Sequence, residues 1–174
     1  PFTFTLAMTV NKTGIVWAIL DYPGGWLDAR TRGSENDGEW ERCRGWIADS
    51  SVLLLPVDAG LLVIRRGIPP HRGELALPGG FIDHEEEWRA AAARELFEET
   101  GIQVDPEGIR ERRVLSAPGG TLLIFGEAQP VRAEDLPAFV PNHEVLERTV
   151  IHQPVPLAFE LHALVVADFF ARRA

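Results

Sequence analysis

Three glutamates, Glu95, Glu98 and Glu99, recur at the spacing i, i+3 and i+4. In an α-helix this spacing places three carboxylates on one face within a single turn. Like charges this close cost about 0.2–0.5 kcal/mol per pair, and acids near a helix C-terminus lose roughly a further 0.3–1 kcal/mol each against the helix dipole. The pattern therefore predicts that something positive lies on this face.

A helix is expected at these glutamates for local reasons. Residues 90–93 are all alanine, the residues that follow are rich in Glu, Arg and Leu, and Gly101 stands where a left-handed C-cap is wanted. At the other end, Asp83 and Glu86 have the spacing of a capping box. Residues 79–102 are thus predicted to be a loop followed by a helix.

The plain alternative for the three acids is a solvated charged face, which is the usual origin of a lone acidic cluster. The helical wheel argues against it, because Trp88, Ala91 and Ala92 fall on the same side as the acids. We therefore expect this face to point toward protein or a cleft. A local rule broken in such a place is typical of a functional site.

The donor atoms on this face indicate which metal would suit it. Carboxylates and a nearby backbone carbonyl offer oxygen without nitrogen or sulfur, which favours Mg²⁺ or Mn²⁺ over zinc. Magnesium usually takes phosphate oxygens as further ligands, so the pattern also predicts a diphosphate substrate. A metal on the diphosphate would neutralise developing charge and lower the pKa of a water that attacks phosphorus.

Residues 80–102 resemble the Nudix box. The likeness rests on this order of residues: Gly80, five residues, Glu86, seven residues, Arg94-Glu95-Leu96, one residue, Glu98-Glu99, one residue, Gly101-Ile102. The strand pattern on either side extends the likeness over residues 50–172. The resemblance implies an α/β fold, the Nudix-type α/β/α sandwich with a mixed sheet, and hydrolysis of a nucleoside diphosphate linked to another moiety.

The resemblance also implies roles for single residues. The metal ligands that it implies by position are Glu95, Glu98, Glu99, the carbonyl of Gly80 and, as a contributor, Glu86. Glu98 is also expected to be catalytic, whereas Glu86 has a helix cap as an equal alternative role. Arg94 precedes Glu98 by four residues and is expected to orient a carboxylate in the catalytic site rather than touch substrate.

The general base in many members of that family comes from the box or from a glutamate on a later loop. Glu144, which follows the proline-containing segment 129–143, is the candidate here. Three further glutamates compete with it: Glu134, Glu147 and Glu160. No partner is visible for His84, His143 and His162, so these histidines are expected to be structural.

Two features mark contacts with substrate. Arg65 and Arg66 close a predicted strand and suit phosphate recognition, with ordinary solvated surface as the equal alternative. Pro118 stands sixteen residues beyond Ile102, which resembles the placement of a proline in ADP-ribose-hydrolysing members. A proline in a turn is commonly only a turn. The pattern therefore favours an ADP-ribose-like substrate without settling it.

The chain is predicted to hold a Nudix domain in residues 47–174, preceded by an N-terminal β-hairpin extension in residues 1–46 that packs on it. Residues 2–10 alternate between apolar and polar types, which is typical of a half-buried strand, and residues 15–20 form a second strand. A hairpin turn is expected at residues 11–14 between them.

Three tryptophans follow the predicted hairpin, at Trp26, Trp40 and Trp46. In one interpretation they pack the extension on the core; in the other, one of them stacks on a substrate base or lines the contact of a homodimer. The elements expected after them are strands at residues 51–57, 61–65, 75–77, 110–116, 121–128 and 145–152, and a helix at residues 157–172.

Composition narrows the classes of function. The chain has 174 residues, enough for one domain with a sizeable core, and its net charge of −9 disfavours nucleic acid as a partner. Cys43 is the only cysteine, so no internal disulfide or cysteine cluster for zinc can form. Neither a signal peptide nor a membrane span is indicated, which makes the cytoplasm the default location.

Three classes of function are compatible with these features. The leading hypothesis is an Mg²⁺-dependent pyrophosphohydrolase whose partner is a small-molecule nucleoside diphosphate derivative. A nucleotide-sensing module that binds without turnover usually shows a damaged box or a fused recognition domain, and neither is apparent here. A structural or protein-interaction domain would rest on the Trp-rich first 46 residues.

Overall fold

The first of two compact units contains a short hairpin. The computed structural model describes residues 10–11, 14–15, 49–83, 85–118 and 121–173, and the units are Pro1–Trp46 and Ile47–Ala174. In the first unit β1 (Val10–Asn11) pairs antiparallel with β2 (Gly14–Ile15), which confirms the predicted hairpin, whose turn residues 12–13 are outside the described residues. The rest of the two predicted strands and the three tryptophans lie outside the described residues.

A mixed sheet of the second unit has the strand order β7-β3-β9-β8. Its strands are β3 (Ser50–Leu54), β7 (Gly79–Phe81), β8 (Arg110–Ser116) and β9 (Leu122–Glu127). Since β3 runs antiparallel to β7 and parallel to β9, the predicted mixed sheet is confirmed. The prediction that residues 79–81 are loop is wrong, because their backbone pairs with β3, a segment far away in the sequence.

The other sheet has the order β10-β5-β4, with β6 paired to β5. Its strands are β4 (Pro56–Val57), β5 (Gly60–Arg66), β6 (Leu75–Ala76) and β10 (Val145–Ile151). The single strand predicted for residues 51–57 is divided at Leu55, so that β3 belongs to one sheet and β4 to the other. Pro56 has no N–H to donate and lies on the edge strand, where a proline is tolerated.

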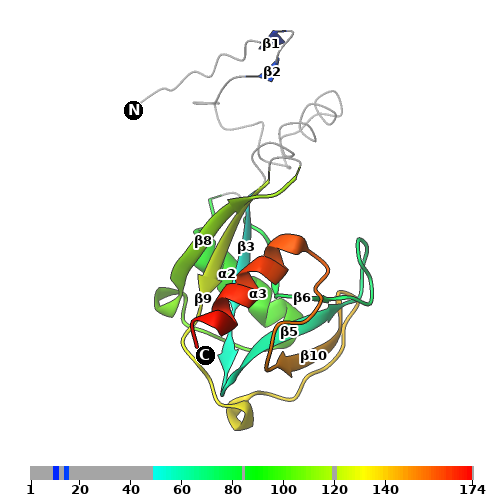
Figure 1. Ribbon diagram of the computed structural model, residues 1–174, viewed down its shortest axis with the longest axis vertical. Coiled ribbons are helices and arrows are strands. Elements are labelled where there is room, and N and C mark those ends of the chain that lie inside the picture. Colours follow the sequence, from blue (N-terminus) through cyan, green and yellow to red (C-terminus); the bar gives the residue numbers. More distant parts are fainter. Residues whose placement is uncertain (1–9, 12–13, 16–48, 84, 119–120, 174) are drawn as a thin grey trace. The chain divides into compact units, whose positions relative to one another are not determined.

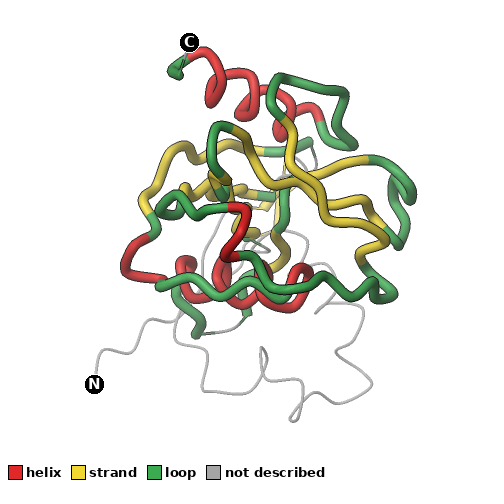
Figure 2. Tube along the Cα trace, turned by 90° about the horizontal axis from the view of Figure 1, so that it is seen from below, coloured by secondary structure: helices red, strands yellow, loops and turns green. Residues whose placement is uncertain are grey.

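Two helices cover opposite faces of the sheets, as Figures 1 and 2 show. They are α2 (Trp88–Thr100) and α3 (Glu160–Ala171), and short 3-10 turns lie at Pro106–Gly108 and Ala133–Asp135. This arrangement of α2 and α3 confirms the expected α/β/α sandwich. None of the described helices combines the length and the apolar character needed to cross a membrane.

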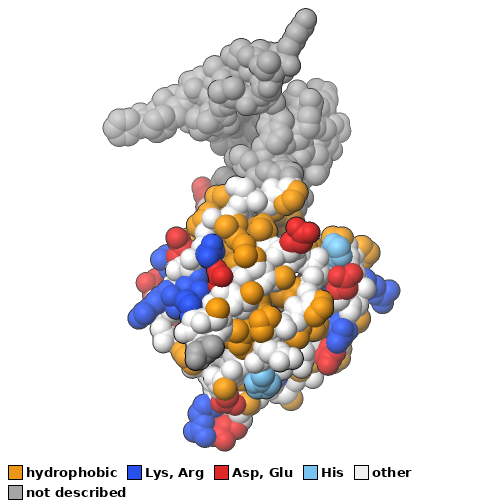
Figure 3. Space-filling model, in the orientation of Figure 1, with side chains coloured by type: hydrophobic (Ala, Val, Ile, Leu, Met, Phe, Trp, Pro, Cys, Tyr) orange, Lys and Arg blue, Asp and Glu red, His pale blue; other side chains and the backbone are white. Residues whose placement is uncertain are grey.

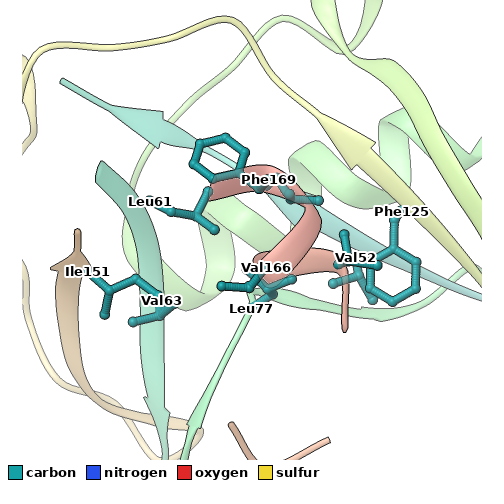
Figure 4. Packing of buried hydrophobic residues seen from close by; sticks show 10 residues of the cluster. Val52, Leu61, Val63, Leu77, Phe125, Ile151, Val166 and Phe169 are labelled. Carbon is teal, nitrogen blue, oxygen red and sulfur yellow. The ribbon is translucent and has the colours of Figure 1, made fainter. Parts of the chain in front are cut away.

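Alternation along β3 explains why both faces need a helix. Val52 and Leu54 belong to the cluster that includes Val166 and Phe169 of α3, part of which Figure 4 shows. Leu53, between them, belongs to the cluster that includes Ala92 and Leu96 of α2. Because successive side chains of a strand point to opposite faces, an unbroken apolar strand must be covered on both sides.

The caps of α2 differ from expectation at one end only. Gly101 has φ 74° and donates its N–H to the carbonyl of Phe97 at 2.8 Å, which confirms the left-handed C-cap. The predicted capping box at Asp83 is wrong, because the helix begins at Trp88 and its N-cap is Glu87. Glu86 accepts the N–H of Asp83 at 3.0 Å, but this contact closes a turn ahead of the helix.

Candidate active site

One guanidinium gathers three of the predicted site carboxylates. Arg94 donates to both oxygens of Glu86 at 2.9 Å, to Glu95 at 2.8 Å and to Glu98 at 3.1 Å. It also donates to the carbonyl of Phe81 on β7 at 3.0 Å. The hydrogen bonds from Arg94 to Glu86 lower the pKa of the Glu86 carboxyl group. Arg94 therefore fixes carboxylates of α2 and of the preceding turn against the end of β7.

Gly80 is where the carboxylate of Glu95 meets β7. A Cβ atom at this position would lie 2.5 Å from the carboxyl carbon of Glu95, so any larger residue would displace this carboxylate. The side chain of Glu95 is 14% exposed, and this burial raises its pKa although Arg94 opposes the rise. The neighbouring carbonyl of Gly80 and the carboxylate of Glu95 thus belong to one small region.

Glu99 is the most deeply buried of the acids. It is 6% exposed and accepts the backbone N–H of Gly79 at 2.9 Å. Burial raises its pKa to about 8, and the negative charges of Glu95 and Glu144 add to the rise. A carboxyl group in this position is costly to ionise unless a further positive charge lies beside it.

Glu98, in contrast, is at the rim of the site. Its side chain is 53% exposed and its described partner is Arg94. Its backbone carbonyl accepts a hydrogen bond from the amide of Asn142 at 3.2 Å. The three glutamates of the helical turn therefore divide into two that face β7 and one that faces outward.

Glu144 lies in the loop before β10, close enough to the acids for its charge to raise the pKa of both Glu95 and Glu99. Its carbonyl accepts the N–H of Gly67 at 2.6 Å, and His143 lies 3.1 Å from its carboxylate. The competing glutamates have other surroundings: Glu134 pairs with Arg132, Glu147 pairs with Arg65, and Glu160 opens α3.

The two predicted phosphate contacts differ. Arg65 is held by Glu147 at 2.7 Å and by the carbonyl of Gly73 at 2.8 Å. Arg66 donates to the carbonyl of Pro70 and stacks over Phe159, and its charge opposes the rise in the pKa of Glu99. Of the two arginines, Arg66 is therefore the one with electrostatic influence on the acids.

Pro118 occupies the exposed turn between β8 and β9. The register of the sheet places Leu123 of β9 and Phe81 of β7 opposite the same residue of β3, Ser50. The turn that precedes Leu122 therefore lies at the end of the sheet that also carries Gly80 and Phe81. No hydrogen bond or ion pair described for the acids involves Pro118.

The donor chemistry of the acids fits a hard divalent cation. Glu95, Glu98 and Glu99 present only oxygen; among the described contacts Arg94 is the cation that hydrogen-bonds Glu95 and Glu98, and Glu99 accepts the N–H of Gly79 instead. In the described part of the chain no three His, Cys, Asp or Glu side chains converge as a finished metal site. The reason is visible in the contacts: Arg94 holds Glu98 and Glu95, while Glu99 is turned to the N–H of Gly79.

Sequence reasoning missed contacts that join distant segments. It did not predict that both carboxylate oxygens of Glu86 accept hydrogen bonds from Arg94, or that the side chain of Asn142 donates to the backbone carbonyl of Glu98. Asn142 carries a usable signal, since asparagine often bonds the backbone two residues ahead, here that of Glu144. No local pattern identifies the carbonyl on α2 that its amide group meets.

Known proteins resemble this chain in sequence and in fold. A family model described as the NUDIX domain matches residues 48–148. A NUDIX hydrolase from Nitrosomonas europaea is 25% identical, with a TM-score of 0.60, and the match covers 74% of this chain and 72% of that one. No match to a curated protein reaches significance.

Two further solved structures concern ADP-ribose. A bifunctional NMN adenylyltransferase/ADP ribose pyrophosphatase from Francisella tularensis is 25% identical, with a TM-score of 0.54, over 67% of this chain and 37% of that one. The NUDIX domain of Shewanella oneidensis NrtR, solved with ADP ribose, is 21% identical, with a TM-score of 0.56, over 74% of this chain and 88% of that one. The match over residues 48–148 covers more than half of the chain, which therefore belongs to the Nudix family and is a pyrophosphohydrolase.

Proposed function

We propose that this chain hydrolyses, with Mg²⁺ or Mn²⁺, the pyrophosphate bond of a nucleoside diphosphate linked to another moiety, with an ADP-ribose-like compound as the favoured substrate. The observation that carries the proposal is the charge balance at α2. Glu86, Glu95 and Glu98 share Arg94, and Glu99 is buried beside them, where its hydrogen-bond donor among the described residues is the backbone N–H of Gly79. Such a surplus of negative charge is stabilised by a divalent cation.

In this proposal the cation is held by Glu95, Glu98 and Glu99 together with the carbonyl of Gly80. Bound there, a divalent cation supplies charge neutralisation for the diphosphate and activation of a water. Glu86 is less suited to bind it, because both of its oxygens are taken by Arg94. Glu86 and Arg94 instead form a brace that keeps Glu95 and Glu98 in place.

Glu144 is proposed as the general base. Its charge acts on Glu95 and Glu99, so its carboxylate is near the acids without sharing their hydrogen bonds to Arg94. There it can take the proton of a water as the oxygen attacks phosphorus and the bond to the bridging oxygen breaks. Arg66, which opposes the charge of Glu99, is the proposed contact for a substrate phosphate.

The choice of an ADP-ribose-like substrate has two supports. The Francisella tularensis relative is described as an ADP ribose pyrophosphatase, and the Shewanella oneidensis domain was solved with ADP ribose. In this chain Pro118 lies in the turn at the end of the sheet that carries Gly80 and Phe81. A substrate held at the acids can extend toward that turn.

A substrate panel tests the proposal. Purified protein with Mg²⁺ is incubated with ADP-ribose and with other nucleoside diphosphate derivatives, and products are separated by ion-exchange chromatography. ADP-ribose and one water are expected to yield AMP and ribose 5-phosphate, and chelation of the metal is expected to stop the reaction. Turnover of other derivatives in preference to ADP-ribose would reject only the substrate assignment.

The alternative, a nucleotide-sensing module without turnover, is separated by the same samples. Tight binding of ADP-ribose by calorimetry, without product from any compound on the panel, would contradict the proposed hydrolysis and favour the sensing role. The matched control is Glu127→Gln, which changes a glutamate on β9 that lies among arginines and outside the site.

A further inference from the structure

Asn142 connects two residues of the proposed site. Its side-chain Nδ2 donates to the backbone carbonyl of Glu98 at 3.2 Å. Its Oδ1 accepts the backbone N–H of Glu144 at 2.9 Å and that of Val145 at 2.8 Å. One short side chain therefore ties the C-terminal part of α2 to the residue proposed as general base.

The orientation of this amide group follows from its partners. A flipped side chain would aim its NH₂ group at the N–H groups of Glu144 and Val145 and its oxygen at the carbonyl of Glu98. Each contact would then be repulsive. Only one orientation of Asn142 satisfies all three partners, and in it both ends of the amide are used.

Other hydrogen bonds also hold this loop, but they do not connect Glu98 with Glu144. Arg148 donates to the carbonyl of Thr100 at 2.8 Å and to that of Pro137 at 2.6 Å, which docks the beginning of the loop on α2. Gly67 donates to the carbonyl of Glu144 at 2.6 Å, which ties the loop to the end of β5. Asn142 is the described side chain whose hydrogen bonds reach both Glu98 and Glu144.

We infer that Asn142 is a positioning residue for hydrolysis, which sets the place of Glu144 relative to Glu98. The inference rests on the proposed function, in which Glu98 holds the cation and Glu144 takes the proton of water. Both groups must face the same reacting phosphorus, and they come from a helix and a loop that are far apart in sequence. A displacement of about 1 Å between such groups can cost on the order of 100-fold in rate.

The competing explanation is a local turn that starts β10. For that role Asn142 needs only Oδ1, which accepts the N–H groups of Glu144 and Val145. The bond from Nδ2 to Glu98 would then be incidental. Asn142→Asp separates the two explanations, because aspartate keeps the acceptor for the turn and loses the donor to α2.

The test measures steady-state hydrolysis of the best substrate of the panel, together with thermal unfolding. Asn142→Asp is expected to lower kcat about 10- to 100-fold with little change in KM, while the melting temperature falls only slightly, because the second carboxylate oxygen repels the carbonyl of Glu98 but the turn keeps its acceptor. The matched control is Asp105→Asn, where an exposed side chain caps Glu107 in a comparable way far along the chain from Glu144. This control is expected to keep the unmodified kcat.

A double-mutant cycle with Glu144→Gln shows whether Asn142 acts through Glu144. If it does, Asn142→Asp has little further effect once Glu144 is changed. Fully multiplicative losses, or an unchanged kcat in Asn142→Asp, would overturn the inference. Full activity of Glu98→Gln would instead reject the proposed function, so the two failures are distinguishable.

Discussion

The two helices that cover the sheets end in opposite electrostatic surroundings. α2 ends in glutamates that outnumber their arginine partner, whereas α3 is followed by arginines that outnumber their glutamate partner. The C-terminal end of a helix carries partial negative charge, so arginines there are favourable and glutamates are not. The charges at the end of α3 are therefore favourable for the helix dipole, and those at the end of α2 are unfavourable.

At the end of α3 the buried carboxylate already has its cations. Glu127 on β9 is 11% exposed, and its carboxylate lies 2.8 Å from Arg112, 3.5 Å from Arg172 and 3.6 Å from Arg173. Arginine side chains gather on the side of the molecule where Figure 1 labels β8, as Figure 3 shows. The carboxylate of Glu127 therefore needs no added cation.

At the end of α2 the opposite holds. Glu99 is more buried than Glu127 and has a backbone N–H where Glu127 has three guanidinium groups. This difference shows that a buried carboxylate does not by itself indicate a cation-binding site in this molecule. Buried acid in excess of its cations does, and the end of α2 shows it.

The largest expected contrast between the two helix ends is in activity. Glu98→Gln removes a proposed metal ligand and is expected to lower kcat/KM about 10²–10³-fold, because the transition-state charge loses part of its stabilisation. Glu127→Gln removes a carboxylate that is already paired with arginines at the end of α3, and this variant is expected to keep the unmodified rate. Both are measured with the substrate that the panel selects, at saturating Mg²⁺.

Circular dichroism of both variants controls for misfolding. Equal losses in Glu98→Gln and Glu127→Gln would erase the contrast, since activity would then follow general stability rather than the unbalanced charges. A selective loss in Glu98→Gln that is relieved when Mg²⁺ is raised above the concentration that saturates the unmodified protein would point to metal affinity as the lost quantity.

The elements that the sequence predicts well are those that local pattern decides. The strand predicted at residues 110–116 coincides with β8, and α2 ends at the predicted Gly101. The division at Leu55 and the pairing of β7 with β3 were not foreseeable, because both depend on which distant strand lies alongside. Periodicity indicates the face of an element and not its neighbour.

In the candidate site, too, the features set by local spacing are predictable and those set by tertiary contacts are not. The spacing of Glu95, Glu98 and Glu99 predicts that they share a helical turn, and the fold places all three in one. Their unequal burial depends on the approach of β7, and the bridge through Asn142 depends on a loop more than forty residues away. These facts are tertiary, so a helical wheel could not supply them.

A smaller contrast concerns the histidine that α3 buries. His162 is 7% exposed and accepts the N–H of Leu77 at 3.2 Å, and burial lowers its pKa from 6.5 to about 4. The unfolded chain therefore binds more protons than the folded one between these values. The stability from neutral His162 is full above pH 6.5 and is lost as the pH falls toward 4, by about 3 kcal/mol in total.

Urea unfolding at several pH values measures this loss. His162→Asn is the matched variant, because its side-chain oxygen can accept the N–H of Leu77 without titrating. Its free energy of unfolding is expected to start lower and to fall less steeply below pH 6.5 than that of the unmodified chain. Parallel pH profiles for the two proteins would show that His162 does not titrate as its burial predicts.

The smallest expected effects are changes in the free energy of unfolding, measured without metal for one variant at each helix end. In the presence of a chelator, Glu99→Gln is expected to raise the free energy of unfolding by about 1–3 kcal/mol, since a buried carboxyl becomes neutral and can keep the N–H of Gly79. Glu127→Gln is expected to lower it by about 1 kcal/mol, because its partly exposed arginines lose their partner.

Urea unfolding with chelator and then with Mg²⁺ completes the comparison. Added Mg²⁺ is expected to stabilise the unmodified chain and Glu127→Gln to a similar extent, and Glu99→Gln much less, because binding to the folded state alone raises stability. Glu99→Gln could instead be destabilising with chelator and gain as much stability from Mg²⁺ as the unmodified chain. The acids of α2 would then need no added cation, as Glu127 needs none. The unbalanced charge at the end of α2 would then no longer be a reason to place the cation there.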